Sequence, residues 1–242
     1  MKRFAVVLAI LTVGFFSSCA ANDQRAEIRA EGASALPSGS LRDWVTYGDY
    51  VVVWEATSER RLPPTPEEIE HNEGTITRLV TVNTSQILWR RPSAPKALSA
   101  PKSLEVANGG WVFHGNDEKP FVVDDRPRLE LGQRYLAVLT YADLSVSSTR
   151  PQGPQWLTFG YFALKDGAVV ANSAGDASGS DLDRLINGKG VAAVQALVAS
   201  TPVDPDAKRY LGLDPVLRYQ RVAEDRIASS SYTPGPGPGE KE

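Results

Sequence analysis

The only cysteine of this 242-residue chain, Cys19, stands directly after an apolar leader, and its position limits how the rest of the chain is held together. If the leader is removed and Cys19 is modified, the remaining domain has no thiol. It then forms no disulfide, no cysteine-ligated zinc site and no cysteine nucleophile. Its stability must come from a packed hydrophobic core, for which about 130 β-rich residues are enough.

Residues 1–18 have the composition of a secretory signal peptide. Lys2 and Arg3 form a positive start, residues 4–16 form an apolar run of 13 residues, and small residues follow. The run is shorter than the roughly 20 residues that a membrane-spanning helix needs. We therefore expect the protein to be extracytoplasmic, with a retained anchor helix as the remaining alternative.

The segment Phe16-Ser17-Ser18-Cys19 resembles the bacterial lipobox, although Phe16 stands where that motif usually has leucine. The resemblance implies that Cys19 is the lipidation site and that the membrane is a partner through this lipid anchor. One acyl chain gives only marginal membrane binding, whereas two or more hold a protein stably. The alternative is plain secretion after cleavage near Cys19.

The charge balance bears on the class of partner. Removal of Lys2 and Arg3 with the leader leaves 24 basic and 29 acidic residues, a formal net charge of −5. An acidic chain that lacks basic stretches with interleaved aromatic residues is not typical of a nucleic-acid-binding protein. We therefore predict no nucleic acid as a partner.

Runs of β-branched and aromatic residues predict a mainly β domain over residues 41–172. In the run that starts at Tyr50, Val51 and Val53 share one face of the expected strand, while Tyr50, Val52 and Trp54 share the other. Because both faces are apolar, we expect this strand to be central and covered on both sides.

Further strands are expected at residues 74–89, 104–113, 120–123, 135–141, 155–164 and 168–171. The apolar positions of the first of these change parity, which predicts a bulge near residues 83–86. Asp166-Gly167 is typical of a hairpin turn. Six or so strands without alternating helices indicate an antiparallel OB-like barrel or sandwich.

The flanking regions differ in composition from this domain. Residues 19–40 are small and polar, and we expect a flexible tether. Residues 173–229 have helical periodicity and predict a short helical C-terminal appendage, with a last helix capped by Asp214-Pro215. Residues 230–242 are rich in Pro and Gly and are expected to be a disordered tail.

Candidate chemical groups are few, because His71 and His114 are the only histidines. His114 follows an apolar strand, and Asp117 could orient it as a general base or metal ligand. A loop histidine that caps a turn is the simpler interpretation, and the sequence has no Gly-x-Ser-x-Gly elbow. We therefore name His114 and Asp117 only as possible binding residues, and predict no catalytic residue, metal site or cofactor.

Three acidic segments have structural explanations. The acids of residues 67–71 follow a proline and suit the first turn of a helix. Asp124-Asp125 precede two arginines, which favours local ion pairing over a cation site. Residues 176–183 have oxygen ligands at calcium-like spacing, but they lack the glycine and terminal glutamate of an EF-hand loop. A helix cap by Ser180 or Asp181 is the simpler interpretation there.

Three segments, VVVWEA at residues 51–56, TVNTSQILW at 81–89 and LELGQRYL at 129–136, resemble strands of netrin-like and tissue-inhibitor-of-metalloproteinase domains. The resemblance implies an OB-like five-stranded barrel. Inhibitory residues do not carry over, because that family uses disulfides and a free N-terminal cysteine amine. The last segment and Trp111-Val112-Phe113 also resemble actinobacterial secreted proteins of unknown function.

These observations favour a non-enzymatic binding domain at the cell envelope, with an envelope protein or ligand as its partner. The partner would contact a barrel face or the proline-rich loop of residues 90–102. The alternative is an envelope hydrolase or metal-dependent enzyme that uses His114 with nearby carboxylates. A purely structural role in the envelope is a third possibility.

Overall fold

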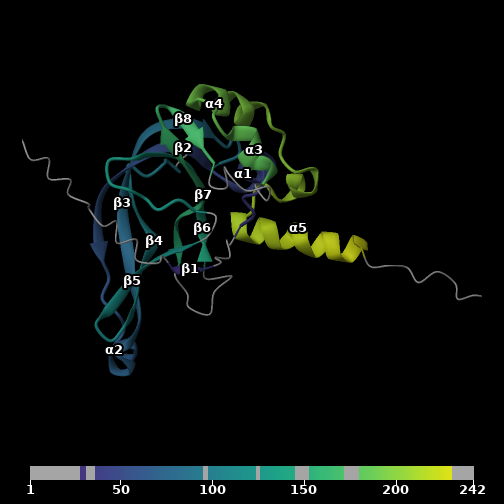
Figure 1. Cartoon of the computed structure of the whole chain (residues 1–242). Helices are drawn as coiled ribbons and strands as arrows, with labels where there is room; N and C mark the ends of the chain where they lie inside the picture. The colour runs from purple at the N-terminus through teal and green to yellow at the C-terminus, as the bar shows by residue number, and fades with distance from the viewer. Residues whose placement is uncertain are drawn as a thin grey trace, which may run out of the picture.

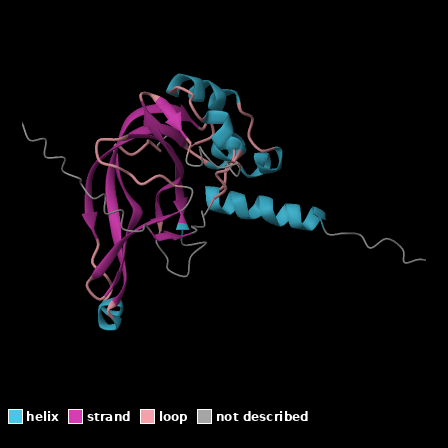
Figure 2. Ribbon diagram, in the orientation of Figure 1, coloured by secondary structure: helices cyan, strands magenta, loops and turns pink. Residues whose placement is uncertain are grey.

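The computed structural model describes residues 28–30, 36–94, 98–123, 126–144, 153–171 and 180–230. Within these residues, eight strands form one sheet in the order β1-β5-β4-β3-β2-β6-β7-β8. Every neighbouring pair is antiparallel except β1 with β5. Helices follow the sheet towards the C-terminus (Figures 1 and 2). The prediction of a mainly β, antiparallel fold with C-terminal helices is therefore confirmed.

The strands are β1 (Ile28–Ala30), β2 (Tyr50–Arg61), β3 (Glu73–Arg90), β4 (Ser103–His114), β5 (Asp117–Val123), β6 (Arg134–Asp143), β7 (Pro154–Lys165) and β8 (Ala168–Val170). The helices are α1 (Leu41–Tyr47), α2 (Pro66–His71), α3 (Asp181–Ile186), α4 (Val191–Ser200), the 3-10 helix η2 (Pro205–Tyr210) and α5 (Pro215–Ser230). Of these elements, β1, α1 and η2 were not predicted.

Strand β2 lies in the middle of the sheet and is buried on both faces, as its sequence predicts. Val51 and Val53 belong to one hydrophobic cluster, whereas Val52 and Trp54 belong to a second one on the opposite face. Burying a side chain of this size fully contributes about 1.5–3 kcal/mol. The strand therefore packs into two hydrophobic cores, one on each face of the sheet.

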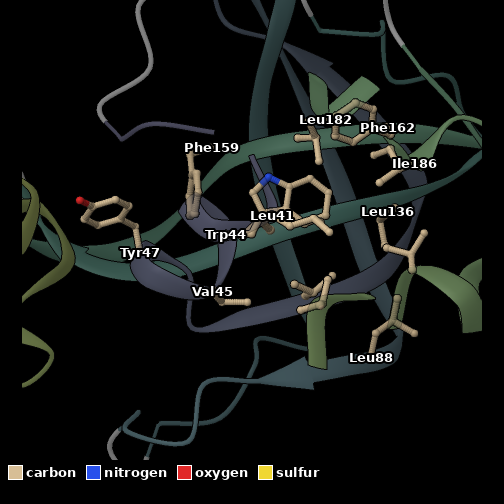
Figure 3. Close-up of a cluster of buried hydrophobic side chains, with 14 of the residues drawn as sticks. Leu41, Trp44, Val45, Tyr47, Leu88, Leu136, Phe159, Phe162, Leu182 and Ile186 are labelled. Carbon is tan, nitrogen blue, oxygen red and sulfur yellow. The ribbon is translucent and has the colours of Figure 1, made fainter. Parts of the chain in front are cut away.

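The first cluster lies between the sheet and the helices. Helix α1, capped by the Ser40 hydroxyl, places Trp44 at its centre (Figure 3). Leu182 of α3 and Val194 of α4 pack into the same cluster, as does Val216 at the start of α5. The predicted appendage therefore shares a core with the sheet instead of standing apart from it.

The second cluster lies on the concave face of a strongly curved sheet. Asn108 of β4 donates a hydrogen bond of 2.6 Å to the Tyr161 hydroxyl of β7, although β3, β2 and β6 separate these strands in the sheet. Arg78 of β3 is 2% exposed and donates to the Asn108 side chain and the Leu129 carbonyl. Burial raises the pKa of Tyr161 to about 12, so its hydroxyl stays protonated.

The sheet is not closed into a barrel in the part of the chain that the structure describes. Its pairing ends at β1 on one side and β8 on the other. The side-chain hydrogen bond from Asn108 to Tyr161 connects β4 and β7, where a closed barrel has a backbone ladder. The predicted alternatives of a barrel or sandwich are corrected to a single curved sheet covered by helices on one face.

The predicted bulge in β3 is present. Ser85 is bypassed between the pairs Val53–Gln86 and Trp54–Thr84 in the register of β2 with β3. Val80 and Val82 before the bulge pack in the second cluster, whereas Leu88 after it packs in the first, so the extra residue turns the strand over between them. Of the apolar residues on which the prediction was based, Ile87 is 52% exposed.

The predicted hairpin turn also forms. Asp166 and Gly167 have φ values of 51° and 79°, as a two-residue type I′ turn requires. Strand β4 runs through Gly109 and Gly110, which have φ values of 61° and 145°, and its register with β3 shifts between Thr77 and Leu79. At Gly110, a Cβ would lie 2.1 Å from the Ile76 carbonyl oxygen, so glycine allows β3 and β4 to approach there.

The described part of the predicted tether belongs to the fold. Ile28 pairs with Phe121 where β1 joins the edge of β5, and Leu36 is 1% exposed. The folded part of the chain thus begins before the predicted boundary at residue 41. The leader, Cys19 and residues 231–242 lie outside the described residues.

None of the helices in the described residues has the length and hydropathy that crossing a bilayer requires.

Candidate functional site

A pocket of about 450 Å³ lies where the start of β2, the end of β6, the loop after β3 and the segment before α5 meet. This volume falls within the roughly 300–1,000 Å³ that is usual for ligand pockets. We call it the junction pocket. Its lining residues are Asp49, Arg91, Ser93, Leu98, Tyr141, Leu211, Gly212, Leu213, Asp214 and Pro215.

A buried ion pair forms the floor of the junction pocket. Asp49 precedes β2 and Arg91 follows β3, and their side chains are 2% and 5% exposed. Nε and Nη2 of Arg91 both donate to Oδ1 of Asp49, at 3.1 and 2.6 Å. Oδ2 of Asp49 accepts from the Thr140 hydroxyl at 3.1 Å and from the Tyr141 backbone N–H at 2.8 Å. The Thr140 hydroxyl also lies 3.0 Å from the Tyr47 carbonyl, so its single proton is shared between the two acceptors. Both oxygens of the carboxylate are therefore engaged within the protein.

Two arginines hold the wall of the pocket in front of α5. Nη1 of Arg91 donates to the Leu211 carbonyl at 2.9 Å and to the Ser93 hydroxyl at 2.8 Å. Arg218, which is fully buried in α5, donates to the same Leu211 carbonyl at 3.1 Å and to the Leu213 carbonyl at 2.8 Å. Burial and nearby Arg91 lower the pKa of Arg218 to about 10, so the guanidinium remains charged at neutral pH.

Asp214 closes this wall and begins the last helix. Its Oδ1 accepts from the Val216 backbone N–H at 2.9 Å, which caps α5 as predicted. Its Oδ2 accepts from the Asp143 backbone N–H at 2.9 Å, which ties the helix start to the end of β6. Both oxygens of this carboxylate are therefore engaged within the protein.

An aromatic series borders the opposite side of the pocket. Tyr141 is 38% exposed, and its ring centroid lies 5.4 Å from that of Trp156 in an edge-to-face arrangement. Tyr50 continues the series, at 5.9 Å from Trp156. The Tyr50 hydroxyl donates to the Leu98 carbonyl at 2.6 Å and accepts from Arg90 Nε at 3.0 Å. These bonds attach the loop of residues 90–102 to the aromatic series.

The polar side chains of the junction pocket are hydrogen-bonded to other protein groups. Among its described lining residues there is neither histidine nor cysteine, and the Ser93 hydroxyl accepts a hydrogen bond from Arg91. The floor is a pair of opposite charges that satisfy each other.

The structure places His114 and Asp117 at the turn between β4 and β5, where they are paired in the sheet register. The His114 side chain is 84% exposed, and its Nδ1 lies 3.4 Å from Glu73 rather than beside the Asp117 carboxylate. Asp117 lies 3.6 Å from the ammonium of Lys119. The structure therefore does not bring the two predicted binding residues together as a base and its orienting acid.

The acidic segments behave as structural elements where they are described. Thr65 and Glu68 form a capping box at the start of α2, and Ser180 caps α3 in the same way. Asp124, Asp125 and residues 176–179 lie outside the described residues. Within the described part, no group of three or more His, Cys, Asp or Glu residues is placed to hold a metal ion.

The titration of Glu68 is a direct test of the cap on α2. Backbone N–H groups of Thr65, at 2.7 Å, and of Thr75, at 2.9 Å, donate to its carboxylate and lower its pKa from 4.5 to about 2. Because the pKa is lowered in the folded state, the carboxylate stabilises the fold above pH 4.5, and this contribution is lost as the pH falls towards 2. We expect the Glu68 carboxyl resonance in NMR to titrate with a midpoint near 2.

The Thr75 amide proton should follow the same curve, and this response should disappear in a Glu68→Gln variant. A midpoint at or above 4 would show that the cap is not formed in solution.

Sequence reasoning named the loop of residues 90–102 as a partner contact and Asp214 as a helix cap, but it did not identify the buried pair of Asp49 with Arg91 or the role of Arg218. Asp49 stands directly before a strand with two apolar faces, and Arg218 lies four residues before Val222, on the buried stripe of α5. A charged residue in such a position signals a buried pair or network. That signal was available for Asp49 and Arg218, but the sequence does not say that they meet.

Fold and site together define a mainly β protein with a preformed pocket between its curved sheet and its C-terminal helices. Comparisons with protein-family models, curated proteins and solved structures found no match for the chain.

Proposed function

We propose that this protein is a lipid-anchored, extracytoplasmic binding domain of the cell envelope without catalytic activity, and that its partner docks at the junction pocket. The observation that carries the proposal is the pocket itself. It is open at the exposed side chains of Tyr141 and Leu213, and the carboxylates of Asp49 and Asp214 are already hydrogen-bonded within the protein. The described residues of such a site form a fixed binding surface and offer no reactive group.

The position of the pocket supports the sequence-based hypothesis that a partner contacts the proline-rich loop of residues 90–102. Ser93 and Leu98, from the loop of residues 90–102, form part of the lining. The competing hypothesis of a hydrolase or metal enzyme at His114 has less support, because that side chain is exposed to solvent next to a single carboxylate. A general base in an active site is usually held in a pocket beside its reaction partner.

Anchoring through Cys19 is supported by the leader and the lipobox-like segment. A lipid anchor on the extracytoplasmic side would hold an acidic domain at the membrane surface. In this arrangement the domain meets partners within the envelope.

We also infer that the sheet is an opened relative of the OB-like barrel. Strands β4-β3-β2-β6-β7 have the neighbour order of a five-stranded barrel that is interrupted between β4 and β7. The Asn108–Tyr161 hydrogen bond spans that interruption. The three segments that resemble netrin-like strands fall on β2, on β3 and at the start of β6, which are neighbours in the sheet.

Site-specific photo-cross-linking in intact cells tests the binding site. With benzoylphenylalanine in place of Ser93, at the rim of the pocket, we expect a discrete adduct. With the same group in place of Ile69 we expect none, because Ile69 is similarly solvent-exposed but lies on α2, at the far end of the β2–β3 hairpin (Figure 1).

The Ser93 adduct should weaken when Tyr141 is replaced with alanine. Equal adducts at both positions, or an adduct only from a benzoylphenylalanine in place of His114, would contradict the proposed site.

A further inference from the structure

We infer that the junction pocket accepts one uncharged aromatic side chain, presented by a partner polypeptide. This inference rests on the proposed binding function and adds the chemistry of the group that enters. Three features carry it: the balance of charge in the pocket, the aromatic series at its border, and the exposure of its rim.

The described charged residues of the pocket and its supports balance one another. Asp49 and Asp214 of the lining contribute two negative charges, whereas Arg91 of the lining and Arg218, which holds the Leu211 carbonyl, contribute two positive charges. Both oxygens of Asp49 accept hydrogen bonds, and Arg91 uses four of its five N–H groups on Asp49, Ser93 and Leu211. Among the described residues, an entering carboxylate or ammonium would therefore lose water and meet only charges that are already paired, which is unfavourable.

The apolar part of the lining favours a ring. Tyr141, Leu98 and Leu213 surround the opening, and Pro215 forms part of the wall. The Tyr141 ring, which lines the pocket, is held by its edge-to-face contact with Trp156. An additional ring packed on Tyr141 would extend this series, and such pairs contribute about 0.5–1.5 kcal/mol beyond the area they bury.

The exposure of the rim favours a side chain of a larger molecule over a free small ligand. Tyr141 is 38% exposed and Leu213 is 40% exposed. Sites for small molecules usually bury most of the ligand surface, roughly 70–90% or more. A side chain on a polypeptide needs only its ring covered by the pocket, while the partner's backbone and neighbouring residues cover the rim. Tyrosine and tryptophan are the residues most often found as such anchors.

A series of capped tripeptides tests this inference on the purified domain. The peptides have the form acetyl-Gly-X-Gly-amide, where X is Tyr, Leu, Glu or Lys, and free p-cresol is the fifth probe. Binding is followed by NMR at the amides of Tyr141, Gly212 and Leu213. We expect the Tyr peptide to bind in the millimolar range and the Glu and Lys peptides at least about tenfold more weakly, a difference of 1.4 kcal/mol.

Two variants and a matched control locate the binding. Tyr141→Ala and Leu213→Ser should each weaken the Tyr peptide severalfold, while Ile69→Ser on α2 should leave it unchanged. Leu213→Ser keeps the backbone carbonyl that Arg218 binds, so a well-dispersed spectrum is expected for this variant.

Each other outcome overturns the inference. Equal binding of the Leu and Tyr peptides would exclude a preference for rings, and stronger binding of the Glu or Lys peptide would exclude an uncharged group. Tighter binding of p-cresol than of the Tyr peptide would point to a free small ligand. Absence of binding by all five probes would remove the pocket as a ring site, whereas the cellular cross-link from position 93 tests the proposed function separately.

Discussion

Replacing Asp49 with alanine is expected to destabilise the protein by about 3–5 kcal/mol, the usual cost of removing one partner of a buried ion pair. The substitution leaves the Arg91 guanidinium buried and without its carboxylate, and it removes acceptors from Thr140 and Tyr141. For a domain of this size, each 1 kcal/mol lowers Tm by roughly 2–4 °C. Thermal unfolding followed by circular dichroism should therefore show a Tm lower by roughly 6–20 °C.

Two comparisons separate this effect from a general loss of charge. Glu105→Ala breaks the pair between Arg60 and Glu105, whose side chains are 54% and 47% exposed, and little or no change in Tm is expected. The double variant Asp49→Leu, Arg91→Met replaces both charges with apolar groups and should regain part of the stability that Asp49→Ala loses. If Asp49→Ala unfolds at the same temperature as Glu105→Ala, the pair does not stabilise the floor of the pocket.

Replacing Cys19 with alanine is expected to move the protein from the membrane fraction to the soluble extracytoplasmic fraction. In the proposed anchoring the Cys19 thiol accepts the lipid, and without acyl chains the hydrophobic contribution of about 0.8 kcal/mol per buried CH₂ is lost. Fractionation of cells and metabolic labelling with a fatty acid measure the two consequences together. Both the membrane association and the label should disappear.

The matched control is Ser17→Ala, which keeps a small residue in the same segment and should leave fractionation unchanged. Unchanged membrane association and labelling of the Cys19→Ala protein would contradict lipid anchoring. Intact-mass analysis distinguishes the failure modes. A chain that retains Met1 and is recovered from the cytosol would contradict export itself, whereas a processed chain without lipid would indicate plain secretion.

Features of the fold that depend on local pattern were predictable from the sequence. The two apolar faces of β2, the parity change around Ser85 and the Asp166-Gly167 turn each follow from residues within a few positions of one another. Helix caps at Ser180 and Asp214 were found for the same reason.

The missed elements lack such a local pattern. Helix α1 has only seven residues, too few for helical periodicity to be visible, and it is held by the burial of Trp44 against the sheet. Strand β1 has three residues, whose strand geometry comes from pairing with β5. The opening of the sheet was not predictable either, because it depends on how β4 and β7 approach each other across the second cluster.

The junction pocket is non-local for the same reason. Asp49, Arg91, Thr140 and Arg218 are separated by about 40 or more positions in the sequence, and each one alone resembles an ordinary polar residue. Their roles arise because strand pairing brings Asp49 beside Arg91, and because α5 returns to the sheet with Arg218 facing inward. Sequence reasoning chose His114 instead, since isolated histidines are conspicuous whether or not anything surrounds them.

Helices α3 and α4 and the start of α5 share a core with Val51 and Val53 of β2, which has a practical consequence for work with fragments. In a β-sandwich a second sheet buries the inner face of the first sheet. In this protein the helices bury that face. A fragment that stops at residue 172 would expose the large apolar face of the sheet that the helices cover. Exposed apolar surfaces of that kind promote self-association. Useful shorter versions of this protein must therefore include residues up to and beyond Val216. They should be shortened only at the two ends of the chain.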